Sequence, residues 1–321
     1  MTWTEEVLAE YVLPELRPAV VLNWLTQPDG AHHAFGAGSP EGTETIRADD
    51  QSIGLVLEKL RELGLYDVTN VFVVSDHGFG VHTFQVNLAQ ELVDAGLKDA
   101  LDSDDVVLAS SGQAVSIHVQ GHDPRRIRRL ARYLQKQPWT GVVFTGSKPH
   151  AKDDDFEGWV PGTFSLELVH LDNPERGADL VVTFDWSSEK NAFGVEGTDG
   201  MLTGGGDTGP IEGNGSGHGS MSPWNVRNTW FAWGVDFKNG IHNRAPASNV
   251  DIVPTILALR GMDTDELDGR VLTEALQGGP DYEKLPLETQ TLITEHRDYA
   301  AAIQITEVAH QRYIDKSWRL E

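Results

Sequence analysis

The sequence predicts an α/β protein with a mostly parallel sheet flanked by helices, and three observations support the α/β class. The runs 20–25 and 71–74 are short and mostly apolar, which is typical of strands buried on both faces of a parallel sheet. Between them, residues 44–63 carry apolar side chains at helical spacing and end at Gly64, a residue typical of helix C-termini. Strand, helix and strand in this order form the repeating unit of a parallel sheet.

Length and composition limit what the protein can be. A chain of 321 residues can bury a large core and suits one large domain with an inserted segment, or two domains. It contains no run of eighteen apolar residues, so no membrane span is predicted, and residues 1–6 show no secretory signal. The sequence has no cysteine, which excludes disulfides, thiolate nucleophiles and cysteine-ligated zinc.

The charge balance disfavours nucleic-acid binding. The chain has 25 basic and 49 acidic residues, a formal net charge of −24. Such a surface repels nucleic acid and anionic lipid. An anionic substrate therefore needs a local positive centre, and bound divalent cations are the simplest source of one. The alternative is that the acidity serves only solubility.

The first candidate site lies at the end of the predicted strand 71–74. Asp76 and His77 follow it directly, and Gly78 comes next. The carboxyl ends of strands in open α/β sheets border the crevice where ligands bind. Carboxylate oxygen and imidazole nitrogen together suit Zn²⁺ or Mn²⁺. The alternative is an ordinary turn with Asp76 as a helix cap.

A second candidate pair follows the predicted strand 20–25. Residues 4–17 are predicted as a helix, and after the strand Asp29 and His33 are four positions apart. This spacing lets two side chains meet one ion from a single helical turn or loop.

A third candidate is His218, which lies in the glycine-rich stretch 213–219. Flanking glycines let the backbone approach closely and bring an imidazole into a crowded site. A strand over 228–234 and a capped helix over 248–261 are predicted to follow. By itself, such a histidine is usually a loop residue.

After residue 83 the character of the sequence changes. We predict a helix over 84–100, strands within 105–119, an amphipathic helix over 124–136, and strands near 163–169 and 179–186. Residues 146–217 are rich in Gly, Asp and Pro, as in long functional loops. The predicted organisation is a metal-binding core of residues 1–83 and 216–276, an inserted α+β substrate segment over 84–215, and a helical appendage over 277–321 with a helix from 295 to 314.

Taken in order, these motifs resemble the alkaline phosphatase superfamily, and the resemblance implies an alkaline-phosphatase-like fold. Asp-x-x-x-His at 29–33, Ser-Asp-His-Gly at 75–78 and the glycine-flanked His218 are similar to its type I phosphodiesterase and nucleotide pyrophosphatase branch. The resemblance covers residues 15–276 and includes Leu-Asp-Gly-Arg-Val-Leu at 267–272. The signatures of the arylsulfatases are absent.

The resemblance implies a two-metal site for phosphoryl transfer. Asp29, His33 and His218 match the protein ligands of one zinc, and Asp76 and His77 match two ligands of the second. The implied cofactors are two divalent ions, zinc or manganese, and the implied substrate is a small anionic phosphate ester of the phosphodiester or nucleotide pyrophosphate type. In such a site the two cations clamp a phosphate oxygen and lower the pKa of the nucleophile.

One part of the family pattern is not found. The family's nucleophilic Thr or Ser, and an aspartate that completes the second zinc site, precede the matched motifs, and no Asp-x-x-x-Thr occurs before residue 20. Thr26, Thr203 and Ser220 do not match the nucleophile's position. We therefore expect a chain without its N-terminal nucleophile segment, and an unpaired strand edge beside 20–25 or 71–75. The alternative is a non-catalytic or degenerate member that keeps the fold and part of the metal site.

Overall fold

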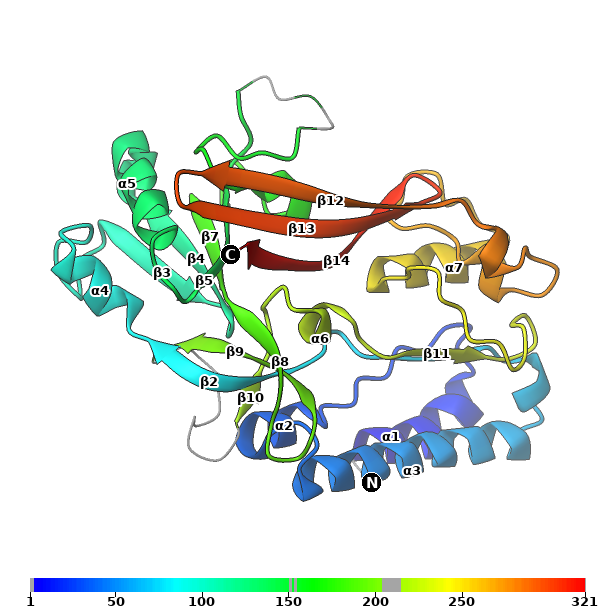
Figure 1. The fold of residues 1–321 in the computed structure, drawn as a ribbon. Coiled ribbons are helices and arrows are strands. Elements are labelled where there is room, and N and C mark those ends of the chain that lie inside the picture. The colour runs from blue at the N-terminus through cyan, green and yellow to red at the C-terminus, as the bar shows by residue number, and fades with distance from the viewer. Residues whose placement is uncertain (1–2, 150–151, 153–154, 204–214, 321) are drawn as a thin grey trace.

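The computed structural model describes every residue except 1–2, 150–151, 153–154, 204–214 and 321 (Figure 1). Helices and several small sheets alternate along the chain, so the predicted mixed α/β class is confirmed. The long helix α3 runs along the bottom of the view, and the C-terminal sheet lies at the top (Figure 1). Among the described residues, none of the helices has the length and apolar character of a membrane span.

The N-terminal helices pack on one another. Helix α1 (Trp3–Val7) continues into a π-helix, Leu8–Leu16, which packs against α3 (Pro40–Glu62). Helix α3 begins at the N-cap Ser39, whose hydroxyl accepts a hydrogen bond from Gly42 N at 3.0 Å. The helices predicted over 4–17 and 44–63 are therefore confirmed.

The strand predicted over 20–25 was wrong. These residues form no strand, and Val20, Val21, Leu22 and Trp24 are exposed, Leu22 by 92%. An apolar run indicates burial, but a strand also needs a neighbouring edge with which to pair its backbone groups. No described segment pairs with 20–25.

Strand β1 (Val71–Val74) forms where predicted, but the expected burial on both faces was wrong, since its first three residues are half-buried and Val74 is exposed. Its partner is β11 (Trp230–Trp233), and the two run antiparallel. They make a two-stranded sheet, so among the described residues β1 pairs along one edge only. An unpaired edge here was expected. Phe72 packs edge-on against Trp230 and Phe237, with ring centroids 5.5 and 5.2 Å apart.

A second sheet lies beside the first and has the strand order β10-β2-β9-β8. Its strands are β2 (Gly80–Val86), β8 (Trp186–Lys190), β9 (Glu196–Leu202) and β10 (Ser216–Gly217). The helix predicted over 84–100 begins later, as α4 (Leu88–Asp94), because Asn87 caps it and the residues before it pair with β9.

The largest core surrounds a five-stranded sheet with the order β3-β4-β7-β5-β6. Its strands are β3 (Val106–Ser110), β4 (Ala114–Val119), β5 (Thr140–Thr145), β6 (Phe164–Ser165) and β7 (Leu180–Phe184). Helix α5 (Pro124–Leu134) packs its apolar stripe against β5 and β7. The expectation of a mostly parallel sheet was wrong, because in the described part of the chain only the β2–β9 and β5–β6 pairs are parallel.

The helix predicted over 295–314 was also wrong. Residues 287–320 form an antiparallel meander of β12 (Leu287–His296), β13 (Tyr299–Val308) and β14 (Gln311–Leu320). The alanines of β13 favour a helix locally. Pairing on both sides of β13 and burial against the five-stranded core outweigh that preference, and the Tyr299 hydroxyl donates to Gly141 O at 2.8 Å.

The remaining helices are short. They are α2 (Asp29–Phe35), α6 (Pro223–Val226), α7 (Ile252–Leu259) and 3₁₀ turns at Tyr66–Val68, Gln120–His122, Leu166–Val169, Asn249–Asp251, Thr273–Ala275 and Tyr282–Lys284. Helices α2 and α6 and the turn at 249–251 border the ends of β1 and β10, where the predicted site residues lie.

Candidate metal centre

Helix α2 presents Asp29 and His33 on one face. They lie one turn apart, and His33 Nε2 is 3.4 Å from Asp29 Oδ1. His33 is buried, and its Nδ1 donates to the backbone oxygen of Ser216 at 2.8 Å. In a neutral His33 ring, this bond leaves the lone pair on Nε2, which faces Asp29, and that is the arrangement that a metal-binding histidine needs.

The end of β1 brings Asp76 and His77 to the same place. His77 Nε2 lies 3.6 Å from Asp76 Oδ1 and 3.8 Å from Asp29 Oδ1. The backbone oxygen of Ser75 accepts hydrogen bonds from the side-chain amides of Asn228, at 2.6 Å, and Asn249, at 3.2 Å. Two segments far along the chain therefore hold the turn that carries Asp76 and His77.

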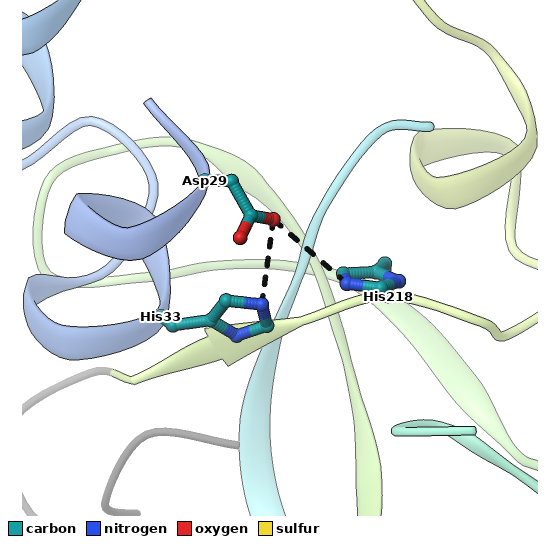
Figure 2. Close-up of side chains that lie close together, drawn as sticks. All are labelled: Asp29, His33 and His218. Carbon is teal, nitrogen blue, oxygen red and sulfur yellow. Dashed lines mark ion pairs between the residues drawn. The ribbon is translucent and has the colours of Figure 1, made fainter. Parts of the chain in front are cut away.

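His218 completes the cluster from the segment after β10 (Figure 2). Its Nε2 lies 3.9 Å from Asp29 Oδ1, and its ring stacks on His77 with centroids 3.5 Å apart. Burial lowers the pKa of His218, and the neighbouring His77 and His33 lower it further. A lowered pKa keeps the imidazole neutral, which is the form that coordinates a metal.

Asp29 Oδ1 is the common point of the cluster. The Nε2 atoms of His33, His77 and His218 lie 3.4, 3.8 and 3.9 Å from it, yet the oxygen is buried and has no hydrogen-bond partner among the described residues. Ligand atoms of Asp29, His33 and His218 all lie within 4.8 Å of one another. A buried, unpartnered carboxylate oxygen facing imidazole nitrogens fits a divalent cation. The structure thus brings all five predicted residues together, and their role as ligands stays a prediction.

The ring of Phe79 and a further histidine, His32, border the cluster. The ring of Phe79 lies edge-on to His33, His77 and His218, with centroids 5.3 to 5.6 Å apart. His32 also packs on Phe79. Burial lowers the pKa of His32, and both of its ring nitrogens are buried with no partner in the described part of the chain.

Among the described residues, none of the three hydroxyls named from the sequence hydrogen-bonds to a side chain of the cluster. Thr26 is exposed, Thr203 follows β9, and Ser220 bonds instead to Asp199 and to Ser222 N. Within the described residues, no hydroxyl hydrogen-bonds to any of the five predicted ligands. Residues 213–214 of the glycine-rich motif lie outside the described residues.

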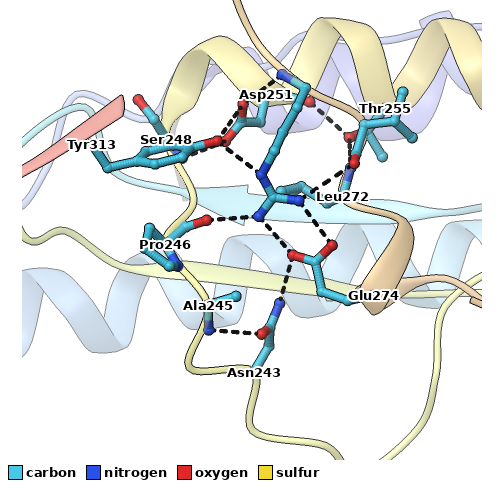
Figure 3. Close-up of polar contacts among 11 residues, drawn as sticks. Asn243, Ala245, Pro246, Ser248, Asp251, Thr255, Leu272, Glu274 and Tyr313 are labelled. Atoms are coloured by element: carbon cyan, nitrogen blue, oxygen red, sulfur yellow. Dashed lines mark hydrogen bonds and ion pairs between the residues drawn. The ribbon is translucent and has the colours of Figure 1, made fainter. Parts of the chain in front are cut away.

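A buried polar network supports the segment before α7 (Figure 3). Arg270 donates two hydrogen bonds to Glu274, at 2.8 and 2.9 Å, and its Nε donates to the Tyr313 hydroxyl at 3.0 Å. Asp251 accepts from Ser248 N at 2.8 Å and from the same tyrosine hydroxyl at 3.0 Å. The network joins the C-terminal sheet to the turn at 249–251, which holds the end of β1 through Asn249.

Sequence reasoning missed a second group of polar residues beneath the cluster. His82, Gln113, Asp199 and Asn225 are all at least 95% buried, although each is a polar type. The available signal was an acid in a run of small residues, Gly-Thr-Asp-Gly at 197–200, where a strand and not a loop forms. Burial lowers the pKa of His82 to about 4, and nearby His33 contributes in the same direction.

Comparison with known sequences identifies the same family that the motifs resemble. Residues 2–189 match the model of the family described as type I phosphodiesterase / nucleotide pyrophosphatase. The chain is 32% identical over 62 residues to human ectonucleotide pyrophosphatase/phosphodiesterase family member 1, and 32% identical over 74 residues to the venom phosphodiesterase of Macrovipera lebetinus. These alignments cover 19% and 23% of this chain but only 7% and 9% of the two relatives.

Solved structures show the same fold. Murine ectonucleotide pyrophosphatase/phosphodiesterase 5, solved as an inactive variant in complex with AMP, superposes with a TM-score of 0.59 at 17% identity. A second structure of that murine protein gives a TM-score of 0.59 at 16% identity. Both superpositions cover 86% of this chain, and 64% and 65% of the murine chains, respectively.

Proposed function

Because the chain belongs to the type I phosphodiesterase / nucleotide pyrophosphatase family, we propose that it is a metal-dependent hydrolase of phosphoric esters. Asp29, His33 and His218 would hold one divalent cation, zinc or manganese, and Asp76 and His77 would contribute to a second. The observation that carries this proposal is the convergence of three imidazole nitrogens on the buried, unpartnered Asp29 Oδ1.

Cations at this site would neutralise phosphate charge and activate the attacking oxygen. The chain's own residues prepare the site for them. His33 is fixed by its bond to Ser216 O, and the lowered pKa of His218 favours the neutral ring, in which one nitrogen is free to bind a metal. Phe79 shields one side of the imidazoles from water, which strengthens electrostatic interactions within the cluster.

The substrate class follows from charge and from the relatives. A net charge of −24 gives the surface no general attraction for anions, so a phosphate ester would be bound through the local charge of the metal centre. The murine neighbour was solved with AMP, which supports a phosphodiester or nucleotide pyrophosphate as the substrate type.

A second candidate function is metal binding without hydrolysis. The observation that favours it is the absence of a hydroxyl hydrogen-bonded to the cluster within the described residues. Covalent catalysis would need such a group beside the metal. In this alternative, the chain keeps the fold and the metal ligands but does not turn over phosphate esters.

The experiment combines zinc titration with an assay on bis(p-nitrophenyl) phosphate. We expect the chain to bind zinc, and both His33→Ala and His218→Ala to weaken binding at least about tenfold, because each removes one ligand of a small set. His242→Ala, which removes an exposed histidine outside the cluster, is the matched control and should leave affinity unchanged.

Turnover that disappears in His218→Ala would support the hydrolase. Zinc binding without turnover would support the second candidate. Zinc affinity that is the same in His33→Ala, His218→Ala and the unmodified chain would contradict the proposed ligand set.

A further inference from the structure

Asp199 is an acid buried without a cationic partner. It lies in β9, only 1% exposed, and forms no ion pair with the lysines and arginines that the structure describes. Its carboxyl group instead accepts hydrogen bonds from Gln113 Nε2, from Asn225 Nδ2 at 3.5 Å and from the Ser220 side chain. Burial raises the pKa of Asp199 well above its usual range. Burying a carboxyl group without a cationic partner costs stability, which indicates that Asp199 has a role other than stabilising the fold.

Gln113 joins Asp199 to the segment that carries His218. Its side chain is fully buried, and besides bonding to Asp199 its Nε2 donates to Gly80 O at 3.1 Å. Its backbone N–H donates to His218 O at 2.9 Å. The approach is so close that a Cβ on Gly112 would lie 2.4 Å from His218 O. The position of His218 therefore follows the position of Gln113.

Asn225 joins the same carboxyl group to the turn that carries His77. Its Nδ2 donates to Asp199 and, at 3.1 Å, to Ser222 Oγ. Its backbone oxygen accepts from Gly78 N at 2.9 Å, one residue after His77. A Cβ on Gly78 would lie 1.8 Å from Trp224 O, so this contact leaves the turn little freedom to move.

We propose that Asp199 is a positioning residue of the metal centre, which holds His218 through Gln113 and His77 through Asn225. The inference rests on the proposed function, because it assumes that these histidines bind metal. The two histidines come from separate segments, and their stacked rings are 3.5 Å apart, so a shift of either segment alters the geometry of both. Asp199 is the one buried group that bonds to both Gln113 and Asn225 among the described residues.

The test measures zinc affinity by competition with a chromophoric chelator. We expect Asp199→Ala to weaken binding by about 10- to 100-fold, as is typical when a residue that orients metal ligands is lost. Asp199→Asn keeps the size and one acceptor oxygen, so it should restore affinity to within a few-fold of the unmodified chain. Gln113→Met keeps the side-chain length but removes the donor, and should weaken binding by roughly tenfold.

Leu130→Ala is the control for loss of stability alone. Leu130 is fully buried in the core of the five-stranded sheet, and it does not belong to the segments that carry His77 and His218. All variants are measured at a temperature where circular dichroism shows them to be folded. Unchanged affinity in Gln113→Met and in a folded Asp199→Ala would overturn the inference, and so would equal weakening in Leu130→Ala.

The same experiment separates the two proposals. If the unmodified chain does not bind zinc, the proposed function fails. If it binds zinc with an affinity that depends on His33 and His218 but not on Asp199 or Gln113, only the positioning role fails.

Discussion

The five-stranded sheet and the part of the molecule that carries the candidate metal centre are stabilised in different ways. Every residue of β5 and β7 is buried, and their apolar side chains belong to one large core. No residue of β1 or β11 is fully buried, and the two apolar clusters near them are small. The segments around the metal centre depend more on buried polar contacts, such as the Arg270 network and the bonds of Asp199.

This difference indicates that the two regions serve different purposes, one providing stability and the other fixing the positions of side chains. An apolar core is non-directional and tolerates small shifts, whereas hydrogen bonds fix distance and angle. A metal centre needs its ligands held to within fractions of an ångström, and the polar contacts supply that constraint. The five-stranded sheet supplies the stability on which the polar part depends.

The largest expected effect comes from the apolar core. Phe144→Ala should lower the free energy of unfolding by about 3–5 kcal/mol, because the fully buried ring leaves a cavity. Phe72→Ala in β1 should cost roughly half as much, since Phe72 is only partly buried. Urea denaturation measures both. Equal losses would show that the two parts of the molecule are stabilised alike.

The next effect tests the polar network. Glu274→Ala should lower the free energy of unfolding by roughly 3 kcal/mol, because it leaves the buried Arg270 guanidinium without its carboxylate. Glu274→Gln, which keeps one acceptor oxygen, should cost less. Thermal and urea unfolding would be compared at one pH. A loss below about 0.5 kcal/mol for Glu274→Ala, as is usual for surface substitutions, would contradict a supporting role for this network.

Zinc should stabilise the segments around the candidate metal centre more than the five-stranded sheet. At a zinc concentration one hundred times Kd, mass action adds about 2.7 kcal/mol to the free energy of unfolding. Hydrogen exchange should show slower exchange at residues 71–80 and 216–220, and little change in β5. A chelator should reverse the protection. Protection spread evenly over both regions would indicate that they unfold as a single unit.

The smallest effect concerns the N-terminal helices. Burial and, to a smaller extent, the negative charge of Glu5 raise the pKa of Asp49 to about 6. A raised pKa in the folded state means that the charged form is disfavoured there, so Asp49→Asn should stabilise the protein by about 1 kcal/mol at pH 7, after allowance for partial exposure. The gain should shrink as the pH falls from 6 to 4 and vanish below 4. Thermal unfolding at pH 7.5 and 3.5 tests this, with the exposed Asp50→Asn as control.

The parts of the site that local sequence patterns specify were predictable. Asp29 and His33 are placed by the repeat of one helix, and Asp76 and His77 follow directly from a strand. The partner of that strand was not predictable in the same way, because β11 lies far along the chain and its direction depends on the whole fold. Residues 20–25 show the same limit, since apolar character alone does not provide a strand with a neighbour.

Segments with mixed local signals were also mispredicted. The alanines of β13 favour a helix, while its pairing with two strands and its burial against a distant sheet require extended backbone. Asp199 could not be recognised as buried, because an acid between small residues is equally typical of a surface turn. In both cases the deciding interactions are with residues distant in sequence.

Because Asp29 and His33 lie on one helix, the proposed metal ligands would come together in a definite order during folding. Their separation is set by a single helical turn and involves no loop closure, whereas the contact of His33 with Ser216 spans 183 residues. The Asp29–His33 pair therefore needs only one turn of α2 to form, whereas the tertiary structure has to bring the imidazoles of the other segments to it. If the cluster binds a metal as proposed, tight binding requires the complete tertiary structure, and metal affinity would then report complete folding.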